Sequence, residues 1–261
     1  MRAALITLAA ASLLASAAQA QGVTAVVAAQ QQRVESTDAR VSGRLVMVDG
    51  SGKRVSYKCS IKEHGFPDGL RLFEEVDAPV PVRVQVRLEH SGRVTARVAH
   101  KSADGKWLPG DYATANPSDA LLGTGFSLED LVENQFFWKE QKLAGKQPCG
   151  SRTCDVLQST PGSLDHSQYS TVVSSTDEKT KAVLHVVKTE RGGVTKDITY
   201  FDLHQSHGVY AATQIEVKVT GKPGSTLFII DRGTAKAGLT RADFDLASPT
   251  LEGQDPKTGD N

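Results

Sequence analysis

The side chains that could support catalysis or metal binding are few and scattered. His204 and His207 are the closest histidine pair, but no third ligand lies near them in sequence, so a solvated turn is favoured over a zinc site. Asp165, His166 and Ser167 have the residue types of a hydrolytic triad, yet triad members meet in space rather than as sequence neighbours. The motifs of serine hydrolases, zinc peptidases, P-loops and dinucleotide-binding folds do not occur. The sequence therefore predicts no catalytic residue, no cofactor and no metal.

Two groups of acidic residues are the other candidates for chemistry. Each is more simply a solvated face, or the first turn of a helix, than a pair of carboxylates for acid–base catalysis. The groups are Glu74, Glu75 and Asp77, and Glu129, Asp130 and Glu133.

Two of the three cysteines are spaced for a disulfide. Cys149 and Cys154 bracket a Gly-Ser-Arg-Thr segment and could close a small hairpin-like loop. A redox-active thiol pair is the alternative, although a C-x-x-C pair at a helix start is the usual redox signature. Cys59 alternates with Val55 and Tyr57 as in a strand, which predicts a small buried side chain.

The first twenty residues have the pattern of a cleaved secretory signal. Arg2 is followed by an uncharged run from Ala3 to Ala17 and by Ala-Gln-Ala at positions 18–20. The apolar run is short for a membrane span, which needs roughly 20 residues, so a retained anchor is the less favoured alternative. We expect a mature protein that begins near Gln21 in the periplasm, where disulfides are permitted.

The remainder is expected to form one β-rich domain over residues 21–246, with a polar tail at 247–261. Val23 to Val34 predicts a short helix, and period-two alternation begins near Asp38. In the clearest hairpin, residues 81–90 turn at Ser91-Gly92, with apolar side chains at 82, 84, 86 and 88 on one face. A second meander covers residues 182–231. Long strands with short turns predict an antiparallel sheet that curls into a barrel or half-barrel.

The middle of the chain has a different pattern. Residues 107–119 hold two prolines and a glycine, which predicts an irregular loop. Ser127 with Asp130 three residues later indicates a helix that begins with a capping box. A strand is expected to begin again at residues 136–138. Phe126, Phe136, Phe137 and Trp138 are either ordinary core or the wall of a cavity. Aromatic residues make up only 6% of the chain, and a curled sheet rich in Val and Ala is filled poorly, which favours a cavity.

Two stretches resemble the outer-membrane lipoprotein-sorting protein family, which is related to the LolA/LolB lipoprotein carriers. GTGFSLEDL at 123–131 is similar to its G-S/T-x-F-S-x-E-D-L segment. VTKDITY at 194–200 and GVYAATQIEV at 208–217 resemble its K-x-I-T-Y and G-x-Y-x-P-T-x-I-E strands, with Ala212 where the family often has proline. The resemblance runs in the same order from about Val34 to Phe244.

The resemblance implies an incomplete antiparallel β-barrel of about eleven strands, with a few short helices plugging the open side. It also implies a non-enzymatic periplasmic carrier or sensor of lipid or lipoprotein acyl chains, held in an apolar concave pocket. The expected partners are that acyl chain and an inner-membrane export or transporter protein, without nucleic acid and without stable membrane insertion. Combined with the alternation, this predicts a lipid-binding wall of Val84, Val86, Leu88, Val98, Phe126, Phe137, Ile198, Tyr200, Ile215 and Val217.

The sequence is also compatible with two other functions. A half-barrel of this kind could bind a protein partner as a signalling or structural module, which an exposed apolar edge strand would favour. A periplasmic hydrolase would require a Ser, a His and a carboxylate to converge in space.

Overall fold

A single antiparallel sheet organises the chain in the computed structural model, which describes residues 22–102, 105–107, 112–163, 165–206 and 209–244. The predicted signal segment and polar tail lie outside the described residues. In the described part, residues 22–35 form the N-terminal helix, as predicted, and thirteen strands follow. The strands are β1 (Asp38–Val48), β2 (Arg54–Phe66), β3 (Gly69–Asp77), β4 (Val82–Leu88), β5 (Val94–His100), β6 (Ala113–Ala115), β7 (Glu140–Cys149), β8 (Arg152–Thr160), β9 (Tyr169–Asp177), β10 (Val183–Glu190), β11 (Thr195–Ser206), β12 (Val209–Val219) and β13 (Ser225–Ala235).

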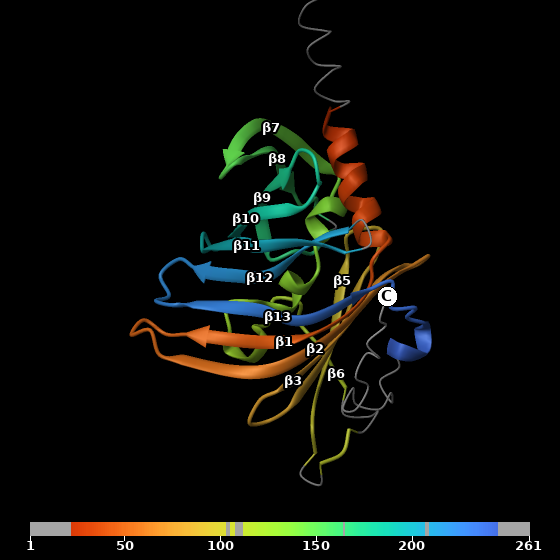
Figure 1. Ribbon diagram of the computed structural model, residues 1–261, viewed down its shortest axis with the longest axis vertical. Coiled ribbons are helices and arrows are strands. Elements are labelled where there is room, and N and C mark those ends of the chain that lie inside the picture. The colour runs from red at the N-terminus through yellow and green to blue at the C-terminus, as the bar shows by residue number, and fades with distance from the viewer. Residues whose placement is uncertain (1–21, 103–104, 108–111, 164, 207–208, 245–261) are drawn as a thin grey trace, which may run out of the picture.

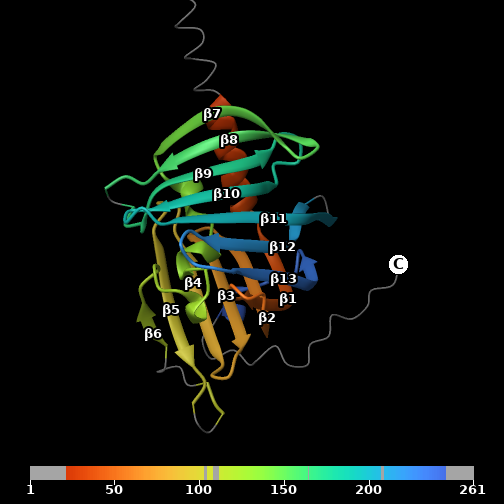
Figure 2. The ribbon, with the colours of Figure 1, turned by 90° about the vertical axis from the view of Figure 1, so that its left-hand side faces the viewer.

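The sheet curls without closing, so the predicted fold class is confirmed. Its strand order is β6-β5-β4-β3-β2-β1-β13-β12-β11-β10-β9-β8-β7, and β6 and β7 are its two edges. The pairing of β1 with β13 joins two meanders into one surface. Figures 1 and 2 show the sheet bent around the segment between β6 and β7, with the N-terminal helix beside it. The sheet has thirteen strands in the described residues, rather than about eleven.

Alternation determines which face of the sheet is apolar. In β4, Val82, Val84, Val86 and Leu88 are at most 2% exposed and point into the concave side. Val84 pairs with Glu74 on β3 and with Val98 on β5, so this face continues across the neighbouring strands. The intervening Arg and Gln side chains of β4 therefore lie on the convex side.

The segment between β6 and β7 fills the concave side, and we call residues 120–138 the plug. It contains three 3-10 turns, η2 (Leu121–Gly123), η3 (Leu128–Leu131) and η4 (Asn134–Phe137). The predicted helix start at Ser127 is confirmed, because the Asp130 carboxylate accepts hydrogen bonds from the Ser127 backbone N–H and hydroxyl, both 2.8 Å. The expected strand at 136–138 is wrong, since these residues complete η4 and its exit, and the next strand begins at Glu140. Within the loop predicted at 107–119, Ala113–Ala115 instead pairs with β5 as the short edge strand β6.

The predicted disulfide is confirmed. Cys149 ends β7, Cys154 lies on β8, and Gly150 takes the turn between them with φ of 64°. Cys59 is free and buried, as predicted, and burial raises the pKa of its thiol. The cross-link therefore joins edge strand β7 to its neighbour β8.

Candidate functional site

The concave face forms one hydrophobic cluster that contains all ten residues of the predicted lipid-binding wall. Six of them are buried, namely Val84, Val86, Leu88, Phe126, Ile198 and Val217. The other four, Val98, Phe137, Tyr200 and Ile215, are partly exposed and pack against the same cluster. Because these six side chains are buried within the cluster, a ligand would reach them only if the residues packed over them moved.

Further members of the cluster are accessible to solvent and were missed by sequence reasoning. Tyr200 pairs across strands with Ile215, which pairs with Phe228. The same surface continues onto β13, β1 and β2 through four partly buried side chains: Val41, Tyr57, Ile61 and Ile230. Period-two alternation in β1, β2 and β13 contained this signal, but it did not identify which strands adjoin β12. We call Tyr200, Ile215 and these four the accessible stripe.

The N-terminal helix covers one side of this cluster. Its Val26 and Val34 are buried, and Val23 and Val27 pack against the cluster. Gln31 Nε2 donates a 2.9 Å hydrogen bond to the carbonyl of Phe136 and so links the helix to the plug. The helix and the plug are thus two covers held to each other as well as to the sheet.

Charged groups lie beside the accessible stripe. Arg33 of the helix forms an ion pair with Glu133 of the plug, and their side chains keep 30% and 20% exposure. Burial and the nearby Glu133 charge raise the pKa of Glu63 to about 7, while Arg33 opposes that rise. Burial also raises the pKa of the Tyr200 phenol. The surroundings of the accessible stripe therefore include the guanidinium of Arg33 and titratable acids next to an apolar surface.

A buried ion cluster anchors the plug to the sheet. Asp130 Oδ1 accepts hydrogen bonds from Tyr169 Oη at 2.6 Å and Lys188 Nζ at 2.8 Å, and its Oδ2 accepts one from Lys196 Nζ at 2.7 Å. Burial alone would raise the pKa of Asp130, but the two lysines outweigh it and hold the pKa well below its usual range. The side chain of Asp130 is 0% exposed, and those of the two lysines are 4% and 6% exposed.

The acids near residue 130 lie in the first turn of η3, which is one of the two predicted alternatives, but they are not a solvated face. Glu129 is also buried, where it accepts hydrogen bonds from Asn134 Nδ2 at 2.8 Å and from the hydroxyl of Ser167. The pattern misled because a helix-start motif usually lies at a surface, whereas this one is inserted into the concave side of a sheet. Two lysines at inward positions of β10 and β11 were the sequence signal for a buried acidic partner.

The acids near residue 75 do not form one solvated face either. Glu74 is 1% exposed on the concave side, burial raises its pKa to about 8, and no hydrogen bond reaches its Oε2 in the described part of the chain. Glu75 points to the convex side and bonds Arg83 Nε at 2.9 Å. Only Asp77 is exposed. Alternation could have separated these faces, because Glu74 is in phase with the inward Leu72 and Val76.

The residues considered for a triad or a metal site serve structural purposes or stand apart. Ser167 bonds Glu129, and Asp165 Oδ2 accepts a hydrogen bond from the Gly162 backbone N–H. His204 is exposed, and His207 is outside the described residues. Across the residues whose placement is described, no three His, Cys, Asp or Glu side chains gather in a metal-binding arrangement. Nor do those residues include a helix with the length and apolarity to cross a membrane.

Solved structures that share this fold at low sequence identity include the following three. An outer membrane lipoprotein-sorting protein domain, as it is named, from Vibrio parahaemolyticus has a TM-score of 0.72 and 16% identity, over 84% of this chain and 97% of that one. A DUF1329 family protein from Desulfovibrio piger has a TM-score of 0.71 and 18% identity, over 85% and 96%. A LolA superfamily protein from Nitrosomonas europaea has a TM-score of 0.64 and 11% identity, over 85% and 96%. The resemblance proposed from sequence is thus confirmed in the fold.

Sequence comparison gives a more specific placement. No curated protein matches the chain. One family model, described as "Uncharacterized protein", matches residues 109–248, more than half of the chain, including the plug and the strands from β7 to β13. The chain belongs to the family that this model describes, and it has the fold of the LolA-like lipoprotein-sorting proteins.

Proposed function

We propose that this protein is a periplasmic, non-enzymatic carrier of lipid or lipoprotein acyl chains, which it holds against the concave face of the sheet. The observation that carries the proposal is the accessible stripe, a set of partly buried apolar side chains that pack against the core inside a curled sheet. Apolar surface is usual in a core, but partly exposed apolar surface on a concave face indicates a ligand.

The energetics of an acyl chain suit such a surface. Each buried CH₂ group contributes about 0.8 kcal/mol, so a handful of methylenes on the accessible stripe yields useful affinity without any covalent chemistry. Movement of the plug would add Phe126, Ile198 and Val217 to the contact surface, and longer chains would then bind more tightly. Release needs only a partner that offers a better apolar environment.

The charged groups beside the stripe suit the polar end of such a ligand. Arg33 is the fixed cation there, and its guanidinium can bind a carboxylate or phosphate in place of Glu133. A ligand with an anionic head and an acyl tail would thus place its head at the helix–plug junction and its tail along the stripe.

Location and partners follow from the same proposal. Residues 1–20 would direct export and be removed, and the Cys149–Cys154 disulfide fits an oxidising compartment. The names of the structural neighbours fit lipoprotein sorting as the setting, with an inner-membrane export or transporter protein as donor. A function in strand addition to a protein partner is less well supported, because edge strand β7 is polar and carries a register shift near Gly145.

The two tryptophans allow a direct test of where an acyl chain binds. Trp138 lies in the concave cluster, while Trp107 stacks on Arg83 on the convex side. A brominated fatty acid quenches only nearby indoles, so the Trp107→Phe variant, which retains Trp138, should show saturable quenching. The matched Trp138→Phe variant, which retains Trp107, should show little. Quenching of neither, or of Trp107 alone, would refute an acyl site on the concave face.

A further inference from the structure

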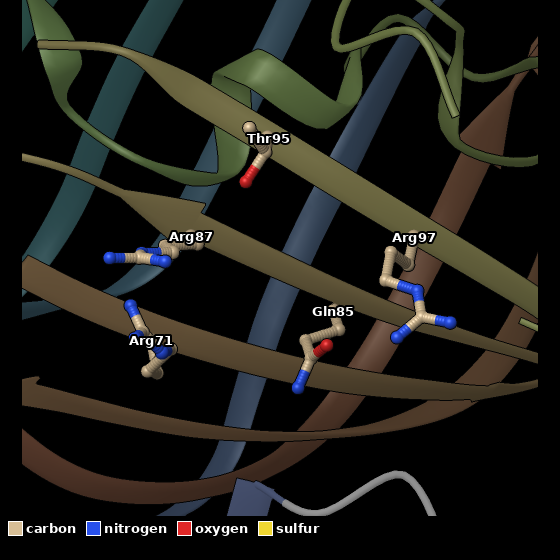
Figure 3. A pocket seen from close by; sticks show the side chains of 5 residues that line it. All are labelled: Arg71, Gln85, Arg87, Thr95 and Arg97. Atoms are coloured by element: carbon tan, nitrogen blue, oxygen red, sulfur yellow. The ribbon is translucent and has the colours of Figure 1, made fainter. Parts of the chain in front are cut away.

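Five polar side chains line a pocket on the convex side, away from the proposed acyl site. They come from β3, β4 and β5 and are Arg71, Gln85, Arg87, Thr95 and Arg97. Figure 3 shows them on three neighbouring strands around a common space, which has a volume of about 270 Å³. A space of this size accommodates a small oxyanion together with part of the group to which it is attached.

Strand register places two positive charges opposite each other in this pocket. Arg71 pairs directly with Arg87, which in turn pairs with Thr95, and Gln85 pairs with Arg97. Like charges in directly opposed positions of an antiparallel pair are unfavourable. The carboxylate of Asp68, which both guanidinium groups contact, offsets part of this repulsion.

The neighbouring carboxylates only partly balance these charges. Asp68 accepts hydrogen bonds from Arg71 at 2.6 Å and from Arg241 at 2.8 Å, and Arg87 reaches the same carboxylate at 3.4 Å. Arg241, with the charge of Arg71, holds the pKa of Asp68 down at about 2. Glu89 Oε1 lies 3.9 Å from Arg87 Nε and is a second acid near these arginines. Three guanidinium groups therefore meet two carboxylates, and Arg97 adds a fourth positive charge to the pocket lining.

Two donor groups of these arginines also remain unsatisfied. Arg71 Nη1 and Arg87 Nε are buried, and no hydrogen bond reaches either atom among the described residues. Arg97 Nη2 donates to the carbonyl of Tyr112 at 3.1 Å, and Gln85 Nε2 donates to that of Phe244 at 2.7 Å, so these two side chains are held in place. Buried guanidinium N–H groups without acceptors are costly, so both arginines carry an unsatisfied donor beside the pocket.

We propose that this convex pocket binds a phosphate group, with Arg71 and Arg87 as its principal ligands and Arg97 and Thr95 at its margin. Planar guanidinium groups match the paired oxygens of phosphate, and two excess positive charges match a phosphomonoester or inorganic phosphate. The phosphate could belong to a soluble molecule or to the headgroup of an anionic phospholipid. The formal net charge of zero conceals this local concentration of arginine.

The test uses the full chain and two charge-matched variants. Arg87→Gln removes a pocket ligand and also relieves the opposed pair, so it should fold at least as stably as wild type. Arg93→Gln removes the same charge from an exposed position outside the pocket. Calorimetric titration with inorganic phosphate in one arm, and flotation with phosphatidylcholine vesicles with or without phosphatidylglycerol in the other, separate the two sources.

Saturable phosphate binding that falls at least about tenfold in Arg87→Gln and persists in Arg93→Gln would support a soluble phosphate ligand. Flotation that requires phosphatidylglycerol, and is lost only in Arg87→Gln, would instead identify a lipid headgroup. Binding in neither arm, or equal losses in the two variants, would overturn the proposal. None of these results bears on the acyl site, which lies on the opposite face.

Discussion

Replacement of Asp130 by asparagine tests whether the buried ion cluster holds the plug in the concave side. The substitution keeps the size of the side chain and removes its charge. Lys188 and Lys196 then remain charged in a site where their side chains are 4% and 6% exposed, and the nearest remaining carboxylate is that of Glu190, 3.9 Å from Lys196 Nζ. The plug should loosen because its principal electrostatic contact with β10 and β11 is lost.

The expected cost is large. Removal of one partner from a buried ion pair typically costs about 3–5 kcal/mol, and two lysines are affected here. For a chain of this size, that corresponds to a fall of roughly 6–20 °C in the melting temperature. The difference in the free energy of unfolding between Asp130→Asn and wild type should narrow below about pH 4. The low pKa of Asp130 stabilises the folded protein only where the carboxyl of the unfolded chain is ionised. This stabilisation is lost as pH falls through the pKa of the folded state.

Equilibrium urea denaturation, followed by tryptophan fluorescence, measures this cost. Asp231→Asn is the matched control, since it makes the same change in the exposed pair with Arg44, whose two side chains are 47% and 45% exposed. The free energy of unfolding of that control should fall by at most about 1 kcal/mol. If Asp130→Asn lost no more than Asp231→Asn, the cluster would not anchor the plug and the reasoning would be refuted.

Three further substitutions test other parts of the structure. Glu74→Gln should be more stable than wild type, by a margin in the free energy of unfolding that grows to about 5 kcal/mol as pH rises from about 4.5 to 8. The reason is that a carboxyl with a pKa raised to about 8 is neutral in the folded protein but ionised in the unfolded chain over that range. Parallel curves of stability against pH for the two proteins would argue against the burial of Glu74. The free energy of unfolding of the double variant Cys149→Ser/Cys154→Ser should be about 2 kcal/mol lower than that of the oxidised protein, because the disulfide joins residues only 5 apart in sequence. Equal stability of the two proteins would contradict this. Gly125→Ala should lower the melting temperature, because its new Cβ would lie 2.8 Å from Cγ1 of Val217; an unchanged value would show that the plug is not tightly packed there.

The fold was largely predictable because most of the chain alternates apolar and polar residues in strands joined by short turns. Alternation in residues 82–88 and short Gly turns, such as Gly92 with φ of 84°, determine hairpins locally. Closure of β1 onto β13 joins segments nearly 190 residues apart, as in the pairing of Gly43 with Ile230. No local pattern encodes that contact, so the accessible stripe across β11, β12, β13, β1 and β2 could not be assembled from sequence.

The site was less predictable because charge and burial depend on tertiary partners. Asp130 occupies a motif that usually begins a surface helix, and only contact with Lys188 and Lys196 explains its burial. The arginines of the convex pocket alternate with core residues, as on any solvated face. Their significance comes from register, which sets Arg71 opposite Arg87. The alternation of apolar residues therefore predicted the apolar face of the sheet, whereas the polar sites could be recognised only in the structure.

Native mass spectrometry of the protein purified from the periplasm, with lipid extraction of the same sample, tests the central claim most directly. Acyl carriage predicts a mass increment at close to one ligand per chain, identified on extraction as a lipid or acylated peptide, and its displacement by added fatty acid. A protein that has only its own mass, and that takes up no acyl probe on titration, would contradict the carrier function.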